Sequence, residues 1–222
     1  MTGVLDALST HGVVPVVVID RALDADYLAE ALVGGGLPVA EVTLRTPAGL
    51  DAIRTLALRG DTLVGAGTVL TAAQVDQAVD AGAAFVVSPG LSRPVVERCL
   101  ELGVPVVPGT VTPTEVMAAL DLGVSCVKFF PAQTSGGVAA VEALAAPFPG
   151  LRIIPTGGIG PDNAAAYLAL GPVAAVGGSW MVSRTLVQAR EVTTIARLCR
   201  EAVELVGTAR GLVGGAGAHV DR

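Results

Sequence analysis

The chain has 222 residues, of which 52% are hydrophobic, and its formal net charge at pH 7 is −6. This length and apolar content can supply one large hydrophobic core, so a single α/β domain is expected. An acidic chain without a cluster of Lys and Arg is not expected to bind nucleic acid, although small anions could bind in local positive pockets. No apolar run is long enough to span a membrane, and residues 1–8 lack the regions of a signal peptide, so we expect a cytoplasmic protein without membrane contact.

Segments with strand-like and helix-like patterns alternate along the chain. Eight strands are predicted, at residues 13–19, 38–45, 63–67, 84–88, 104–107, within 123–132, 152–155 and 173–176. Helices are predicted over 5–11 and 24–32, from Thr46-Pro47 toward Arg59, from about 71, 92 and 112, after each of the last two strands, and over about 192–206.

Eight β/α units in about 200 residues favour a single (β/α)8 TIM barrel, in which the carboxyl ends of the strands and the loops after them form the active face. An open doubly wound sheet is the alternative. It is disfavoured because no G-x-G-x-x-G motif follows the first strand. We expect the barrel to cover residues 1–206 and the glycine-rich residues 207–222 to form a flexible tail.

The cysteines and histidines do not indicate a metal site. Cys99, Cys126 and Cys199 are odd in number, widely separated and without metal-ligand spacing, which is typical of reduced packing residues. His11 and His219 are too few and too near the ends of the chain to suggest a histidine site. We therefore expect neither a metal nor an organic cofactor.

Lys128 stands alone in the apolar run 123–132, with no acidic residue near it in sequence. In a strand, Cys126, Lys128 and Phe130 share one face, and Pro131 ends the strand just beyond them. A lysine desolvated among apolar groups loses its proton more readily than a free one, and the neutral amine is a nucleophile that forms Schiff bases. The structural alternatives are a carboxylate partner in the core, or a buried stem whose ammonium group reaches water.

The second predicted strand carries three polar residues on one face. Alternation places Glu41, Thr43 and Arg45 together, and all three are expected to point into the barrel. Buried polar groups need partners or a function, and Lys128 on the inward face of the sixth strand is an electrostatic partner for Glu41. A purely structural ion pair would not require Arg45, whose forked guanidinium suits a substrate carboxylate.

Small and hydroxyl residues follow most of the predicted strands. Gly157-Gly158 comes after the seventh strand and Gly177-Gly178-Ser179 after the eighth, where barrels often bind phosphate through backbone N–H groups. A single glycine pair commonly serves only a tight turn. Two pairs at neighbouring strands predict a phosphate site.

Six segments together resemble the 2-keto-3-deoxy-6-phosphogluconate (KDPG) aldolases, a family that includes the 4-hydroxy-2-oxoglutarate (KHG) aldolases. The similarity spans about residues 13–206 and follows the order of the family's motifs. The segments are Glu41-Val-Thr-Leu-Arg-Thr46, Gly65-Ala-Gly-Thr-Val-Leu70, Ser88-Pro-Gly90, Lys128-Phe-Phe-Pro-Ala132, Pro155-Thr-Gly-Gly-Ile159 and Gly177-Gly-Ser-Trp180.

The resemblance implies a class I aldolase, independent of any cofactor, that acts on a phosphorylated keto acid as a homotrimer. It makes Lys128 the Schiff-base lysine, Glu41 the general acid/base and Arg45 the ligand of the pyruvate carboxylate. The remaining implied roles fall into two groups: Thr68, Pro89, Phe130 and Thr156 would line the pocket, and Gly157, Gly158, Gly178 and Ser179 would bind the phosphate.

Two positions depart from the family pattern. Gln133 stands where many members carry a glutamate, which changes the charge of that loop. Asp20 follows the first strand, where some members have a basic residue that helps to bind phosphate, although Arg21 is adjacent. Three functions therefore remain open: a KDPG or KHG aldolase, an aldolase for a C4-epimeric or unphosphorylated keto acid, and a noncatalytic phosphate-binding barrel.

Overall fold

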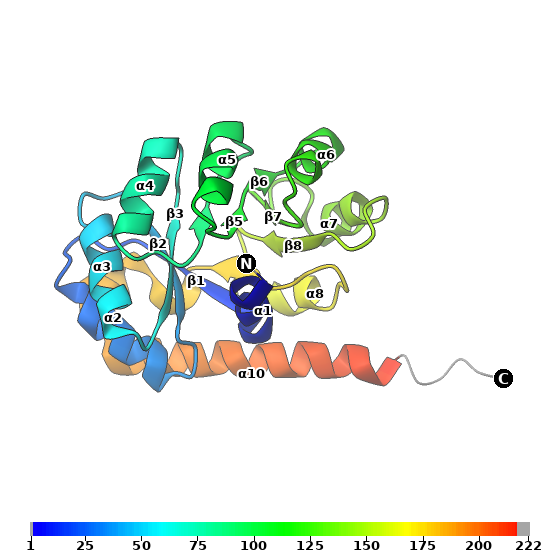
Figure 1. The fold of residues 1–222 in the computed structure, drawn as a ribbon. Coiled ribbons are helices and arrows are strands. Elements are labelled where there is room, and N and C mark those ends of the chain that lie inside the picture. Colours follow the sequence, from blue (N-terminus) through cyan, green and yellow to red (C-terminus); the bar gives the residue numbers. More distant parts are fainter. Residues whose placement is uncertain (1, 217–222) are drawn as a thin grey trace.

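The computed structural model describes residues 2–216 and consists of parallel strands surrounded by helices (Figure 1). The strands are short and almost entirely buried, as expected of a parallel sheet that is covered by helices. They are β1 (Val13–Val17), β2 (Val39–Thr43), β3 (Leu63–Gly67), β4 (Val86–Val87), β5 (Val106–Val107), β6 (Gly109–Thr110), β7 (Cys126–Phe129), β8 (Arg152–Pro155) and β9 (Val176–Gly178).

The helices alternate with the strands along the chain. They are α1 (Thr2–His11), α2 (Asp24–Gly34), α3 (Gly49–Arg59), α4 (Ala72–Asp80), α5 (Arg93–Glu101), α6 (Pro113–Asp121), α7 (Gly137–Ala145), α8 (Ala164–Leu168), the 3-10 turn η1 (Trp180–Val182), α9 (Arg184–Gln188) and α10 (Val192–Ala216). Thr71 caps α4 through its side chain, and Thr112 with Glu115 forms a capping box on α6.

The strands pair in parallel in two groups, β5-β4-β3-β2-β1-β9 and β6-β7-β8. Only Pro108 separates β5 from β6 in sequence, and an isolated bridge joins Thr156, just after β8, to Gly177 in β9. The two groups are therefore continuous, and together they form one curled parallel sheet. This arrangement brings the carboxyl ends of the strands to a common side, as the sequence predicted for the active face.

Two predicted boundaries were wrong. Thr46 does not cap α3, because Ala48 is the N-cap residue and the Thr46 hydroxyl instead donates a hydrogen bond to the carbonyl oxygen of Ile19. The last strand, predicted at 173–176, is paired over Val176–Gly178, while Val173 makes only an isolated bridge to Ile153.

The prediction of a flexible tail from residue 207 was also wrong for part of that segment, because α10 continues to Ala216. Packing of the helix on the barrel explains the extension. Ala209 is buried, and the Arg210 guanidinium donates hydrogen bonds of 2.6 Å to the backbone carbonyls of Ser9 and Ala174. Residues 217–222 of the predicted tail lie outside the described residues.

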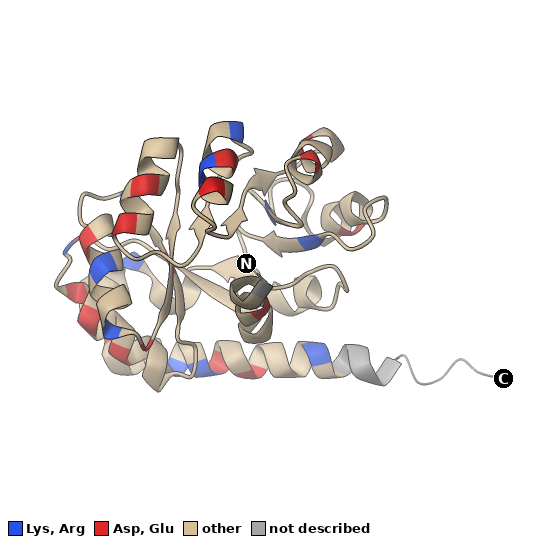
Figure 2. Cartoon of the chain, in the orientation of Figure 1, with Lys and Arg blue, Asp and Glu red and all other residues tan. Residues whose placement is uncertain are grey.

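In the ribbon of Figure 2, α5 and α10 carry both acidic and basic residues, whereas α4 carries acidic residues without basic ones. No helix within residues 2–216 has the length and apolar content required to cross a membrane. Cys99, Cys126 and Cys199 are buried free thiols, and burial raises the pKa of each to about 12, so they remain protonated packing groups.

Candidate active site

Lys128 of β7 and Glu41 of β2 meet in the interior of the curled sheet. The Lys128 Nζ lies 3.2 Å from Oε1 and 3.5 Å from Oε2 of Glu41. Their side chains are only 7% and 4% exposed. Although 87 positions separate them in sequence, the fold gives each buried charge its partner, as the inward-facing pattern predicted.

Glycines on β3 create the space that the carboxylate occupies. Gly67 pairs in register with Thr43, and a Cβ atom at position 67 would lie 2.1 Å from Glu41 Oε1. A Cβ atom at Gly65 would lie 2.3 Å from the ring of Phe85. Any side chain at these positions would displace Glu41 or Phe85, and this steric constraint explains the two glycines of the Gly65-Ala-Gly67 motif.

The surroundings of the pair are mostly apolar. The Lys128 Nζ lies 5.2 Å from the centroid of the half-buried Phe130 ring, a cation–π contact that orients the amine. Behind the pair, a cavity of about 10 Å³ is lined by Leu8, Val14, Glu41, Phe85, Val87, Val107, Lys128, Ile154, Thr156 and Gly177. That volume corresponds to about one water molecule, so reacting groups at the amine would be largely shielded from solvent.

Thr43 and Thr156 bring hydroxyl groups to this region. Thr156 is buried at the end of β8, and its Oγ1 would lie 2.3 Å from a Cβ atom at Gly177, so the glycine accommodates the threonine. Thr43 is fully buried, and its Oγ1 has no hydrogen-bond partner among the described residues. The predicted inward orientation of Glu41 and Thr43 agrees with their burial.

Arg45 lies beyond the strand that carries Glu41 and Thr43, and its predicted role stays a prediction. Strand β2 ends at Thr43, so the alternation of side chains does not extend to Arg45, which is exposed in the turn that follows. Thr68 and Pro89 are half-buried just after the ends of β3 and β4. These three residues therefore follow the carboxyl ends of β2, β3 and β4, on one side of the curled sheet.

The predicted phosphate-binding residues lie on adjacent loops. Gly157 and Gly158 follow β8 with φ angles of 101° and 73°, which favour glycine. The bridge between Thr156 and Gly177 places this loop beside Gly178 and the exposed Ser179. The backbone N–H of Gly158 donates to no acceptor within residues 2–216 and is therefore available to an anion.

The residues after β1 are engaged elsewhere. Asp20 accepts hydrogen bonds from Arg184 and Gln188, and the bond from Arg184 is the main cause that lowers the pKa of this half-buried carboxyl. Arg21 pairs with the buried Asp24 at 2.9 Å. The adjacent basic residue noted in the sequence therefore already has a carboxylate partner.

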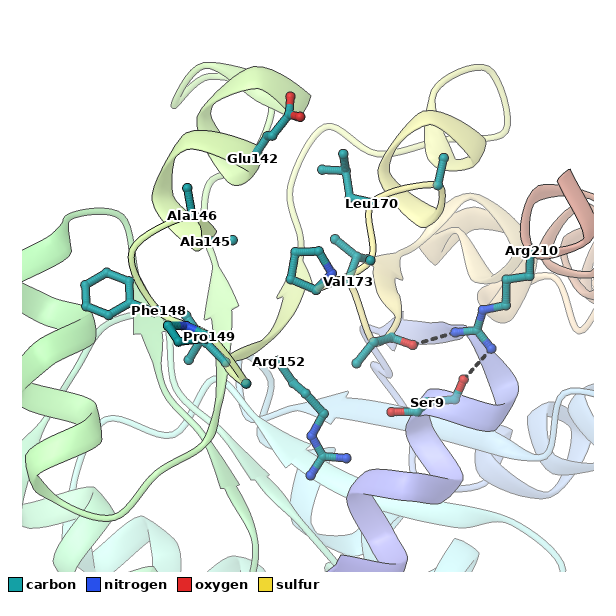
Figure 3. A pocket seen from close by; sticks show the side chains of 16 residues that line it. Ser9, Glu142, Ala145, Ala146, Phe148, Pro149, Arg152, Leu170, Val173 and Arg210 are labelled. Carbon is teal, nitrogen blue, oxygen red and sulfur yellow. Dashed lines mark hydrogen bonds between the residues drawn. The ribbon is translucent and has the colours of Figure 1, made fainter. Parts of the chain in front are cut away.

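A second cavity, of about 990 Å³, lies between α7, α8 and the end of α10, near the amino ends of the strands (Figure 3). Phe148 and Leu170 supply apolar walls. Arg152 is paired with Asp6 at 2.8 Å, and Arg210 is bound to backbone carbonyls. Because neither Lys128 nor Glu41 lines this cavity, the candidate site is the buried pair rather than this cavity. No group of three or more His, Cys, Asp or Glu residues in the described part of the chain could hold a metal ion.

Comparison with known proteins identifies the relatives of this chain. The family model described as KDPG and KHG aldolase matches residues 4–198. The 2-dehydro-3-deoxy-phosphogluconate aldolase of Haemophilus influenzae is 46% identical over 204 residues, which cover 91% of this chain and 96% of the relative. The KHG/KDPG aldolase of Escherichia coli K12 is 46% identical over 198 residues, covering 89% and 93%.

Solved structures agree with these relatives. The KDPG aldolase of Zymomonas mobilis ZM4, crystallised with 3-phosphoglycerate, has a TM-score of 0.86 and 42% identity over 90% of this chain and 95% of its own. The KDPG aldolase of Legionella pneumophila, in which pyruvate was captured as a covalent carbinolamine, has a TM-score of 0.86 and 40% identity over 89% and 97%. Sequence and fold match over nearly the whole length, and the chain therefore belongs to the KDPG and KHG aldolase family.

Proposed function

We propose that this protein is a class I aldolase that cleaves KDPG to pyruvate and glyceraldehyde 3-phosphate. The observation that carries the proposal is the buried contact of 3.2 Å between Lys128 Nζ and Glu41 Oε1. A nucleophilic amine beside a proton acceptor, in apolar surroundings, is the arrangement that Schiff-base chemistry requires.

In this mechanism Glu41 takes the proton of the Lys128 ammonium group, and the neutral amine attacks the C2 ketone of the substrate to give a carbinolamine. Glu41 returns the proton to the carbinolamine hydroxyl, which leaves as water, and a protonated imine remains. Glu41, acting through a water molecule, removes the proton of the C4 hydroxyl. The C3–C4 bond then breaks, its electrons pass to the imine to give an enamine, and the aldehyde departs. Protonation of the enamine at C3 and hydrolysis of the resulting imine release pyruvate and restore the amine of Lys128.

The remaining residues are assigned by their places near the carboxyl ends of the strands. Arg45 is proposed to bind the substrate carboxylate, since its exposed guanidinium can pair bidentately with one. Thr68, Pro89, Phe130 and Thr156 are proposed to line the pocket. Gly157, Gly158, Gly178 and Ser179 are proposed to bind the phosphate, as the adjacency of their loops supports.

The closure of the sheet and the oligomeric state are part of the same proposal. We infer that the curled sheet closes as one eight-stranded barrel, with β5 and β6 counted as a single strand about Pro108. A homotrimer, which the family resemblance implies, can be tested by light scattering of the purified protein. The cytoplasmic location expected from the sequence stays a prediction.

Trapping of the imine tests the mechanism directly. Incubation with pyruvate and borohydride should add one reduced pyruvyl group to Lys128 alone, as measured by intact mass and peptide analysis. Absence of the adduct would mean that the pair is a structural ion pair in a noncatalytic barrel, and an adduct on another residue would refute the role of Lys128.

Substrate comparison tests the specificity. Pyruvate release should be fastest from KDPG, when compared with its C4 epimer and with KHG, which yields pyruvate and glyoxylate. A preference for the epimer or for an unphosphorylated keto acid would keep the class of reaction and replace the substrate.

A further inference from the structure

The proposed phosphate loop is held by a side chain that sequence reasoning did not single out. Asn163 precedes α8, and its Oδ1 accepts a hydrogen bond of 2.9 Å from the backbone N–H of Gly160. Its Nδ2 donates to the carbonyl oxygen of Gly158 at 3.0 Å. One amide group therefore binds both ends of the turn from Gly158 to Gly160.

Gln133, in the loop after β7, holds the same turn from another direction. Its backbone N–H donates to the carbonyl oxygen of Gly157 at 3.0 Å. A Cβ atom at Gly158 would lie 2.6 Å from the Cβ of Gln133, so the two segments are in close contact. The side chain of Gln133 continues the network, because its Oε1 accepts a hydrogen bond of 3.4 Å from Asn163 Nδ2.

Tyr167, on α8, fixes the orientation of the Gln133 amide. The residue is fully buried, and its hydroxyl donates to Gln133 Oε1 at 2.9 Å. Burial raises the pKa of the phenol, so the hydroxyl remains protonated and acts as a donor. The network thus runs from a buried tyrosine through two amides to the backbone of the loop.

The geometry of the peptide bond gives this network a consequence for ligand binding. In a trans peptide the carbonyl oxygen and the following N–H point in opposite directions. Binding the carbonyl oxygens of Gly157 and Gly158 therefore turns the N–H groups of Gly158 and Ile159 away from Gln133 and Asn163. Within residues 2–216 neither N–H has an acceptor, so both are free to bind an anion.

We propose that Gln133, Asn163 and Tyr167 are positioning residues that direct the N–H groups of Gly158 and Ile159 toward the phosphate of the substrate. The inference deepens the proposed function and rests on its phosphate assignment. The ligand class is a phosphate monoester of a keto acid. The network determines how much the phosphate group contributes to the binding of the substrate.

Gln133→Met is the principal test, because methionine keeps the length of the side chain and removes the oxygen that Tyr167 and Asn163 share. KM for KDPG should rise about tenfold to a hundredfold while kcat changes less than about threefold, as expected when oriented hydrogen bonds to a charged group are lost. For 2-keto-3-deoxygluconate, which lacks the phosphate, kcat/KM should change less than about threefold. Tyr167→Phe, which deletes only the donor, should act in the same direction with a smaller effect.

Gln77→Met is the matched control, since Gln77 is exposed on α4, and it should leave both substrates unaffected. Thermal unfolding of every variant checks that the fold is retained. Equal losses for both substrates in Gln133→Met and Tyr167→Phe, or an unchanged KM for KDPG, would overturn the positioning role.

Ser179→Ala separates this inference from the proposal on which it rests. If Ser179→Ala weakens the wild-type preference for the phosphorylated substrate and Gln133→Met does not, only the positioning role fails. If the wild-type enzyme itself treats both substrates equally, the phosphate assignment fails and the inference fails with it.

Discussion

Replacement of Glu41 by glutamine separates the catalytic from the structural role of the buried pair. The substitution keeps the size of the side chain beside Gly67 but removes the carboxylate that lies 3.2 Å from Lys128 Nζ. Loss of a positioned acid/base typically costs about 10² to 10⁴ in rate, so kcat for KDPG cleavage should fall by that factor. Imine formation with pyruvate, which depends first on the amine, should be slowed less and remain detectable by borohydride trapping.

The same substitution should lower stability. Because the side chains of Lys128 and Glu41 are 7% and 4% exposed, removal of one partner leaves the other charge in the core without compensation. Breaking such a buried pair costs about 3 to 5 kcal/mol when the remaining group stays charged. At about 2 to 4 °C per kcal/mol for a domain of this size, the expected decrease in Tm is at most about 20 °C.

Glu142→Gln is the matched control, because Glu142 is exposed on α7 at the rim of the second cavity (Figure 3). It should change neither kcat nor Tm measurably. Turnover of Glu41→Gln within about threefold of wild type would show that the carboxylate only neutralises the lysine, and the proposed proton transfer would then need another residue.

Other consequences of the structure can be measured separately. Ser179→Ala should reduce kcat/KM for KDPG by about tenfold to a hundredfold and hardly affect an unphosphorylated analogue; equal losses would mean that the serine shapes the barrel. Activity should survive a strong chelator, and its loss, with recovery on metal addition, would contradict the metal-free mechanism. Thr110→Val should raise the free energy of unfolding by about 1 to 2 kcal/mol in denaturant titrations, because the buried Thr110 hydroxyl has no partner among the described residues; a destabilised variant would show that the hydroxyl is satisfied. The backbone N–H of Val111 lowers the pKa of Glu115 in the folded chain, so the carboxylate stabilises the fold above its unfolded pKa and loses this effect as pH falls through its folded pKa; the stability difference between wild type and Glu115→Gln should therefore shrink on acidification, and a difference independent of pH would refute the assignment.

The regular elements could be predicted because a buried parallel strand and an amphipathic helix leave different periods in the sequence. The apolar run at 13–19 became β1, and the helices predicted from about residues 71 and 112 are α4 and α6, which follow Thr71 and Thr112. The family prediction is confirmed by the match over residues 4–198. Sequence patterns predicted the helices and strands correctly where interactions between residues close in sequence determine the structure.

The errors arose where distant contacts decide instead. Thr46 looks like a helix cap in sequence, but its hydroxyl binds the carbonyl of Ile19 from the preceding unit. Residues 207–210 look flexible because they are small and include glycine, yet Arg210 secures them through carbonyls of α1 and of the segment before β9. The alternation of side chains in β2 does not extend to Arg45, because the strand ends at Thr43.

The network around the phosphate loop was missed for a similar reason. Gln133, Asn163 and Tyr167 come from three separate positions, and none has a spacing that indicates a site. The departure at Gln133 was visible as a change of charge, but its role as an acceptor for Tyr167 appears only when the loop after β7 meets α8. A polar residue that orients backbone through another polar residue leaves no periodic signal.

The glycines of the motifs indicate which neighbouring side chains need space. Gly67 leaves room for the Glu41 carboxylate, Gly177 for the Thr156 hydroxyl and Gly158 for the Gln133 side chain, each with a distance of 2.6 Å or less to a hypothetical Cβ atom. In each case the glycine lies on the strand or loop beside a residue that the proposed chemistry or its support uses. A glycine at the carboxyl end of a strand in this sheet therefore indicates that a side chain on the neighbouring segment needs the space. Applied to Gly109, whose Cβ atom would lie 2.1 Å from the carbonyl oxygen of Pro89, the same reasoning indicates that Pro89, which we propose to line the pocket, is held in place by the close approach of β6.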